Sequence, residues 1–403
     1  MLIRRSAGLL ATALLIGLTP PLTGESRAGT SDWLLRFTGD FIAAQRVSQG
    51  KSVKIALLAD GVAPGVKTLR GRLEKEKDLV GTPRPKRVVG TLMASLIAGG
   101  APTAGSFAGV LGLAPKATIL SVRVYAEANE PGGRTWRDSA DWGQNLAKGI
   151  RYAVDHGADV IAVNAYATGS ETSELSTAIA YAQTKKAVVV ATTGIQQPDN
   201  PVYPVSAPGV IGVGTVTQKG LRDKKTTSRS SDTLVSAPDS TTLSIGPDNR
   251  LWTLGGEPLA LAFTTAAVAL VRSEYPRLTP AQVGQALSAS ARRPKGKGRY
   301  DTELGFGYLN AVGALEEARK LAPQDAPAMT AKSSVPDSAR LGGEKPGTIR
   351  AAPYDPLWIG GFGGLAFAGL VALGFAAWLA LRKRSAPLPA PALPSEPADT
   401  TGT

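Results

Sequence analysis

The chain has no cysteine and a single histidine among its 403 residues. A domain without cysteine has no disulfides and must be stabilised by its hydrophobic core. The one histidine, His156, stands in the sequence YAVDHGADV, which predicts a helix end with the imidazole near the last carbonyl groups. No other histidine is available as a general base, and nothing in the sequence indicates a metal or a cofactor.

Hydrophobic residues make up 43% of the chain, enough for one large core with appendages. In residues 1–28, Arg4 and Arg5 precede an apolar stretch, which is followed by small and polar residues. This pattern predicts a secretory signal peptide that is cut near Ala28. Residues 29–321 then form the predicted globular domain.

Charged side chains are absent from Leu357–Leu381, a segment long enough to span a bilayer. Trp358 and Trp378 lie toward its two ends, as interfacial residues do, and three basic residues follow it directly. Since positive charge marks the cytoplasmic side, we expect a single-pass, type I protein of the cell membrane. Its main domain is extracellular, its stalk is the Pro/Ala/Gly-rich segment 322–356, and its cytoplasmic tail is 382–403.

Basic residues outnumber acidic ones, and the formal net charge is +13. Without the signal segment (+2) and everything from Leu357 on (+1), a charge of +10 remains. Basic clusters occur at Lys67–Lys77, Arg84–Arg87 and Arg292–Arg299. Such a surface either increases solubility or attracts anionic lipid headgroups and envelope polymers. No nucleic-acid motif is present, and nucleic acid is not an expected partner.

Short apolar runs alternate with helical patterns along the domain. The predicted strands are Val53–Leu58, Thr118–Tyr125, Val160–Ala165 and Ala187–Ala191. The predicted helices are Leu92–Ala98, Arg134–Asp155, Glu174–Lys185 and Leu259–Leu270. This alternation predicts an α/β fold whose mostly parallel central sheet carries helices on both faces. Clefts in such sheets open at the carboxyl ends of the strands.

Four segments resemble the blocks that carry the catalytic residues of subtilisin-like serine proteases. In chain order they are IALLADGV (Ile55–Val62), VGTLMASLIAG (Val89–Gly99), VVVATTGI (Val188–Ile195) and GEPLALAFTTAAVALVRSEYP (Gly256–Pro276). Two further stretches match, YPVSAPGVIGV (Tyr203–Val213) and LGFGYLNAVGAL (Leu304–Leu315). The resemblance implies a subtilisin-like three-layer domain, followed here by one C-terminal transmembrane helix.

The residues that this family uses for catalysis are absent from those blocks. The family reads Asp-Thr/Ser-Gly, His-Gly-Thr, Gly-Asn and Gly-Thr-Ser. Matching the neighbouring residues places Ala59 at the aspartate, Val89 at the histidine, Ile195 at the oxyanion asparagine and Pro258 at the serine. None of these side chains can transfer a proton or attack a carbonyl. In subtilisin, losing the serine or the histidine alone lowers turnover about 10⁶-fold, so a chain that lacks all of them retains binding only.

Neighbouring residues have structural interpretations. Asp60 is one position beyond the predicted aspartate, and because such a shift turns a strand side chain to the opposite face, we predict a turn residue. Pro258 suits the first position of a helix. The groove strand, Ser-Leu-Gly in active members, is matched here by the residues Asn164, Ala165 and Tyr166. Tyr166 adds bulk where glycine leaves room.

Signal peptide, protease-like domain, stalk, membrane helix and tail together resemble the mycosins, membrane-anchored subtilases associated with type VII secretion. The resemblance implies partners in a membrane secretion complex. Our leading hypothesis is a catalytically inactive, membrane-tethered pseudoprotease that acts as an extracytoplasmic scaffold or interaction domain. Two alternatives stay open. One is a working serine endopeptidase with unconventional catalytic residues, and the other is a binder of anionic cell-envelope polymers.

Overall fold

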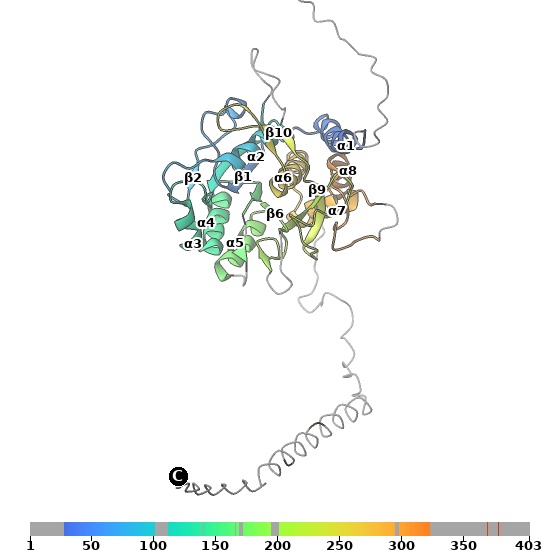
Figure 1. Cartoon of the computed structure of the whole chain (residues 1–403). Helices are drawn as coiled ribbons and strands as arrows, with labels where there is room; N and C mark the ends of the chain where they lie inside the picture. The colour runs from blue at the N-terminus through green and yellow to red at the C-terminus, as the bar shows by residue number, and fades with distance from the viewer. Residues whose placement is uncertain are drawn as a thin grey trace, which may run out of the picture. The chain divides into compact units, whose positions relative to one another are not determined.

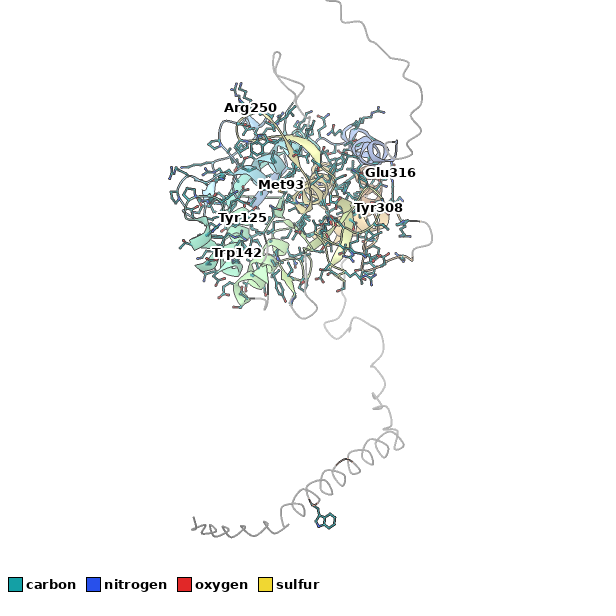
Figure 2. The ribbon with its side chains drawn as sticks, viewed as in Figure 1. Met93, Tyr125, Trp142, Arg250, Tyr308 and Glu316 are labelled. Carbon is teal, nitrogen blue, oxygen red and sulfur yellow. The ribbon has the colours of Figure 1, made fainter. Side chains whose placement is uncertain are left out.

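The computed structural model describes residues 28–100, 112–139, 141–165, 167–168, 172–194, 201–294 and 298–322, with Gly369 and Trp378. The chain divides into two compact units, Met1–Pro327 and Ala328–Thr403. Nearly all described residues belong to the first unit, and Figure 2 draws their side chains. The predicted signal peptide before Ala28, the stalk beyond Ala322, the membrane helix apart from two residues, and the tail lie outside the described residues. Within the described part, no helix is both long and apolar enough to cross a bilayer.

A seven-stranded parallel sheet forms the centre of the first unit, in the order β2-β3-β1-β4-β6-β8-β9. These strands are β1 (Lys54–Ala59), β2 (Lys77–Asp78), β3 (Thr118–Arg123), β4 (Val160–Val163), β6 (Val188–Thr192), β8 (Ile211–Val216) and β9 (Thr233–Pro238). The inner strands are buried on both faces, and their sequences are therefore almost continuously apolar. The predicted α/β fold with a parallel sheet is confirmed.

Helices cover both faces of this sheet (Figure 1). Helices α2 (Val88–Ala98) and α6 (Glu257–Glu274) pack together on one side, and α4 (Trp142–Asp155) and α5 (Ser173–Thr184) pack together on the other. Helix α6 is buried continuously from Leu259 to Arg272, as its apolar sequence predicts. The other elements are α1 (Ala28–Gln45), η1 (Lys67–Leu69), α3 (Gly133–Ser139), α7 (Pro280–Ser290), α8 (Ala311–Leu321), and the two-stranded sheets β5 (Ala167–Thr168) with β7 (Val202–Tyr203) and β10 (Thr242–Ile245) with β11 (Leu251–Leu254).

Two local predictions have different outcomes. The single helix predicted over Arg134–Asp155 is wrong, because the chain forms α3 and then α4. The Asp141 side chain accepts a hydrogen bond from the Gln144 N–H at 2.8 Å, and this N-cap starts α4 as a separate helix.

The prediction for His156 is confirmed, since its Nδ1 lies 2.8 Å from the Tyr152 carbonyl oxygen at the end of α4.

Helix α1 is attached to the domain by an aromatic cluster. The rings of Phe37 and Phe41 lie 6.4 Å and 5.5 Å from the ring of Phe263 on α6, and all three side chains are buried. The next residue, Ile42, is 61% exposed. One face of α1 therefore belongs to the hydrophobic core.

We expect Phe41→Ala to lower the free energy of unfolding by about 3–5 kcal/mol, because it leaves a cavity beside Phe263. Urea denaturation of the full-length protein, followed by circular dichroism, measures this difference. Ile42→Ala on the same helix is the matched control and should stay within about 0.5 kcal/mol of the parent. Equal losses in the two variants would show that α1 does not pack in this way.

Candidate functional site

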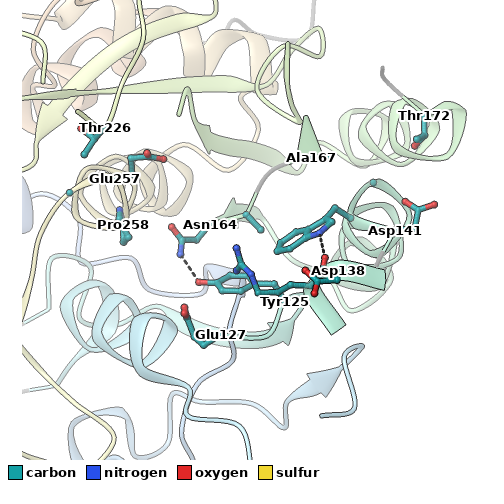
Figure 3. Close-up of a pocket in the computed structure, with 15 residues that line it drawn as sticks. Tyr125, Glu127, Asp138, Asp141, Asn164, Ala167, Thr172, Thr226, Glu257 and Pro258 are labelled. Atoms are coloured by element: carbon teal, nitrogen blue, oxygen red, sulfur yellow. Dashed lines mark hydrogen bonds between the residues drawn. The ribbon is translucent and has the colours of Figure 1, made fainter. Parts of the chain in front are cut away.

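A cavity of about 900 Å³ opens at the carboxyl edge of the sheet, the edge at which the fold predicts a cleft. Its volume is near the upper end of the range of about 300–1,000 Å³ usual for ligand pockets. Figure 3 shows that its walls come from segments far apart in the chain. They are Tyr125 and Glu127 after β3, Arg137, Asp138, Asp141, Trp142 and Gly143 around α3 and α4, Asn164, Ala165, Ala167 and Thr172 after β4, Thr226 after β8, and Gly256, Glu257 and Pro258 at the start of α6.

Pro258 stands in this wall as the second residue of α6, one position later in the helix than the sequence predicted. Gly256 precedes the helix with φ of +72°, a conformation that favours glycine. Between them, the Glu257 carboxylate receives a hydrogen bond from the Thr192 side chain, and burial raises the pKa of Glu257. The position predicted for the nucleophile thus presents a proline ring beside a carboxyl group.

Asp60 lies directly after β1 and is fully buried. Its Oδ1 and Oδ2 accept hydrogen bonds from the backbone N–H groups of Gly90 (2.6 Å) and Val89 (3.1 Å) in the first turn of α2. The positive end of a helix favours such an anion. Burial nevertheless dominates and raises the pKa of Asp60 to about 6, although the two N–H groups favour the charged form. The predicted turn residue is therefore a buried cap for α2.

The approach between β1 and α2 is close enough to require glycine at position 90. A Cβ atom there would stand 2.3 Å from the Gly61 carbonyl oxygen. A second ionic contact holds the same junction: Arg87 pairs with Glu76 at 2.7 Å, and Glu76 also accepts hydrogen bonds from the Val62 N–H and the Ser121 hydroxyl. The start of α2 is thus fixed against β1 by two carboxylates.

The remaining predicted site residues fall into three groups. Ala59 ends β1 and is fully buried, and Val89 is the half-buried second residue of α2, next to the Asp60 carboxylate. Asn164 and Ala165, predicted as the substrate groove, line the cavity together with Pro258. Ile195 and Tyr166 lie outside the described residues. The match of these positions to the catalytic and groove residues of the family stays a prediction.

Aromatic side chains form the floor of the cavity. The rings of Tyr125 and Trp142 stack 6.2 Å apart, and the Arg137 guanidinium lies 5.4 Å from the Trp142 ring. The Tyr125 hydroxyl accepts a hydrogen bond from Asn164 at 3.3 Å (Figure 3). Burial, and then the negative charges of Asp60 and Glu127, raise the pKa of Tyr125 well above its usual value, so the phenol keeps its proton at neutral pH. Among the described residues, no group of three or more histidine or acidic side chains is placed to hold a metal ion.

The subtilase family model matches residues 50–307, which contain the sheet and the whole cavity. The chain belongs to the subtilase family. Among curated relatives, thermitase of Thermoactinomyces vulgaris is 29% identical over 273 residues, 67% of this subtilase and 91% of thermitase. Mycosin-1 of Mycobacterium tuberculosis is 30% identical over 285 residues, which cover 59% of this subtilase and 62% of Mycosin-1, less than two thirds of the relative.

Two solved structures extend this comparison. A serine protease MycP1, described as an essential component of the type VII (ESX-1) secretion system, has 28% identity and a TM-score of 0.57 over 71% of this subtilase and 88% of MycP1. A chain from the periplasmic assembly of the ESX-5 inner membrane complex has 23% identity and a TM-score of 0.58, over 82% of this chain and 92% of its own. The second likeness shows a shared fold alone.

The sequence motifs did not reveal Asp60 as a cap, or the cavity residues Tyr125, Glu127 and Trp142. A cap between two segments needs their spatial contact, and Asp60 and Gly90 are thirty positions apart. The available signal was the Gly-Thr pair after Val89, which marks the helix start but not the partner of its N–H groups.

The Asp60 carboxylate predicts a pH dependence of stability. Its pKa rises from 3.8 in the unfolded chain to about 6 in the folded one, so between these values the folded state binds more protons. The free energy of unfolding therefore decreases as pH rises through this window, by up to about 3 kcal/mol from this group. We expect Asp60→Asn to gain stability relative to the parent between pH 4 and pH 7, measured by urea denaturation at each pH.

Asp60→Ala separates titration from capping. Like Asp60→Asn, it should lack the parent's loss of stability between pH 4 and pH 7, but its whole profile should lie lower by about 1–3 kcal/mol, because two helix N–H groups lose their acceptor. If both variants and the parent keep parallel profiles across this pH range, the carboxylate is not buried as described.

Proposed function

We propose that this subtilase is a catalytically inactive, membrane-tethered pseudoprotease that acts as an extracytoplasmic scaffold or interaction domain. The observation that carries this proposal is the junction between β1 and α2. There the buried carboxylate of Asp60 is bound by the N–H groups of Val89 and Gly90, and the side chain at the predicted histidine position is an alkyl group. The junction therefore holds no imidazole that could activate a hydroxyl.

The single histidine does not replace that base. His156 follows α4 and precedes β4, whereas the cavity lies beyond the other end of that strand. Four residues of strand separate the two positions by roughly 13 Å. The His156 ring also stacks on the Tyr152 ring, with centroids 3.8 Å apart. Because of this separation, we do not expect His156 to support acyl transfer in the cavity.

The alternative of an endopeptidase with unconventional residues would need another nucleophile in the cavity. Its described walls hold two threonine hydroxyls. Thr172 caps α5 by accepting a hydrogen bond from the Leu175 N–H, and Thr226 hydrogen-bonds the Thr215 hydroxyl at 2.7 Å. Both hydroxyls have structural roles, so this alternative is the weaker one.

We expect the full-length protein to hydrolyse no peptide above background and to form no adduct with a fluorophosphonate, which labels activated serines whatever the substrate. Pro258→Ser should also stay at background, because family catalytic residues act as a unit and the base would still be missing. Mass spectrometry of the treated proteins is the measurement. A labelled serine in the parent, or turnover by Pro258→Ser alone, would place the active residues elsewhere.

Restoring activity would need Ala59→Asp, Val89→His, Ile195→Asn and Pro258→Ser together. Even then, Asp60 already occupies the N–H groups at the start of α2 and would lie beside the new aspartate. Two neighbouring carboxylates oppose each other's ionisation.

For the tether and the partners, we propose that the protein is anchored in the cell membrane through Leu357–Leu381 and contacts type VII secretion machinery. Support comes from the uncharged segment itself, from the similarity to Mycosin-1 and from the description of MycP1 as a type VII component. The net charge of +10 outside the membrane also keeps open a contact with anionic envelope polymers.

Crosslinking in membranes should recover secretion components with the intact protein. Cutting the chain after Arg350 should release the domain and weaken this recovery, because the tether maintains a high local concentration at the membrane. A soluble truncated domain that supports the full cellular phenotype would contradict the tethered scaffold. Recovery of envelope polymer instead of protein would favour the polymer-binding alternative.

A further inference from the structure

The cavity differs in charge from the domain that surrounds it. Four carboxylates stand in its walls, Glu127, Asp138, Asp141 and Glu257, against one cation, Arg137. The domain as a whole is strongly basic. A ligand with a positive charge would therefore be attracted by the local field of the cavity and not by the outer surface.

Three of these carboxylates have no cationic partner among the residues that the structure describes. Within the described residues, no ion pair involves Glu127, Asp138 or Glu257, although eight ion pairs are present elsewhere. The single cation, Arg137, lies over the ring of Trp142. Carboxyl groups without a cationic partner therefore face the cavity on the side of β3 and on the side of α6.

An independent feature of the cavity calls for a hydrogen-bond acceptor. Tyr125 is only 8% exposed, and its hydroxyl accepts from Asn164. The hydroxyl hydrogen has no acceptor among the described residues, and a buried donor of this kind is costly to leave without one. Figure 3 shows this hydroxyl directed into the space between Asn164, Glu127 and Pro258. A carbonyl oxygen of a ligand would satisfy it.

From these two features we propose that the cavity binds a basic side chain of an extended polypeptide. The ammonium or guanidinium group lies between Glu127 and Glu257, its aliphatic stem packs on the stacked rings of Tyr125 and Trp142, and a carbonyl of the same segment accepts the Tyr125 hydrogen. A polypeptide supplies the cation, the apolar stem and the carbonyl together, and a volume of about 900 Å³ holds more than one of its residues. The inference rests on the proposed function, because a segment that is bound and not cut is a partner.

The test uses the full-length protein and two labelled peptides, acetyl-Ala-Ala-Arg-Ala-Ala-amide and its analogue with citrulline in place of arginine. Citrulline keeps the shape of arginine but has no charge. Fluorescence anisotropy should show the arginine peptide binding at least about 10-fold more tightly, as expected for hydrogen bonds to a charged group. Equal affinity for the two peptides, or no binding of the arginine peptide, would overturn the proposal.

Three variants locate the contact. Glu127→Gln and Glu257→Gln should each weaken the arginine peptide about 10-fold and leave the citrulline peptide unchanged, since only the charge is removed. Glu316→Gln makes the same change on the exposed surface of α8, far from Tyr125 in Figure 2, and should have no effect. If Glu316→Gln matches the cavity variants, or if the cavity variants bind normally, the peptide binds elsewhere.

Tyr125→Phe tests the carbonyl contact separately. It should weaken both peptides by the same factor, because the phenol recognises the main chain and not the side chain. Mass spectrometry of the bound peptides distinguishes binding from cleavage. Cleaved peptide would overturn the proposed inactivity and leave the specificity for a basic residue intact, whereas absence of binding would overturn the inference and leave the inactivity intact.

Discussion

The contact between the Asp60 carboxylate and the first turn of α2 is the constraint on which the site depends. It joins the end of β1 to the helix that carries the predicted histidine position. In a chain of this family with an intact triad, the same junction must present a base and its orienting acid. Here the side chain that reaches the junction is used to hold the helix, and burial makes its negative charge costly.

The neighbouring residues support the same constraint and the shape of the scaffold. Glu76 and Arg87 hold the adjoining loop, Gly90 allows the close approach, and α6 starts with Glu257 and Pro258 in positions that suit a helix. Each residue is consistent with local stability. A cleft at the carboxyl edge of a parallel sheet forms whenever the strands and their following loops are in place, and it needs no catalytic side chain.

What such a cleft binds is then decided by the side chains in its walls. In this subtilase they are aromatic on the floor and acidic at the sides, and the Tyr125 phenol remains protonated. Such contacts discriminate among ligands whether or not a reaction follows, because binding energy does not depend on the reaction.

The sequence by itself determined the α/β class, the parallel sheet, the buried character of α6 and the helix-end role of His156. These features follow from hydrophobic period and local capping, which act over a few neighbouring residues. It also identified the substituted blocks, although their match to catalytic positions is a prediction from resemblance. It did not determine the break between α3 and α4, where a cap at Asp141 competes with a continuous helical pattern.

Only the tertiary structure decided that Asp60 is a buried cap and that Tyr125, Glu127, Trp142 and Glu257 share one cavity. The physical reason is that these groups come from separate segments of the chain, and burial, electrostatic field and hydrogen-bond partners exist only once the strands and helices have packed.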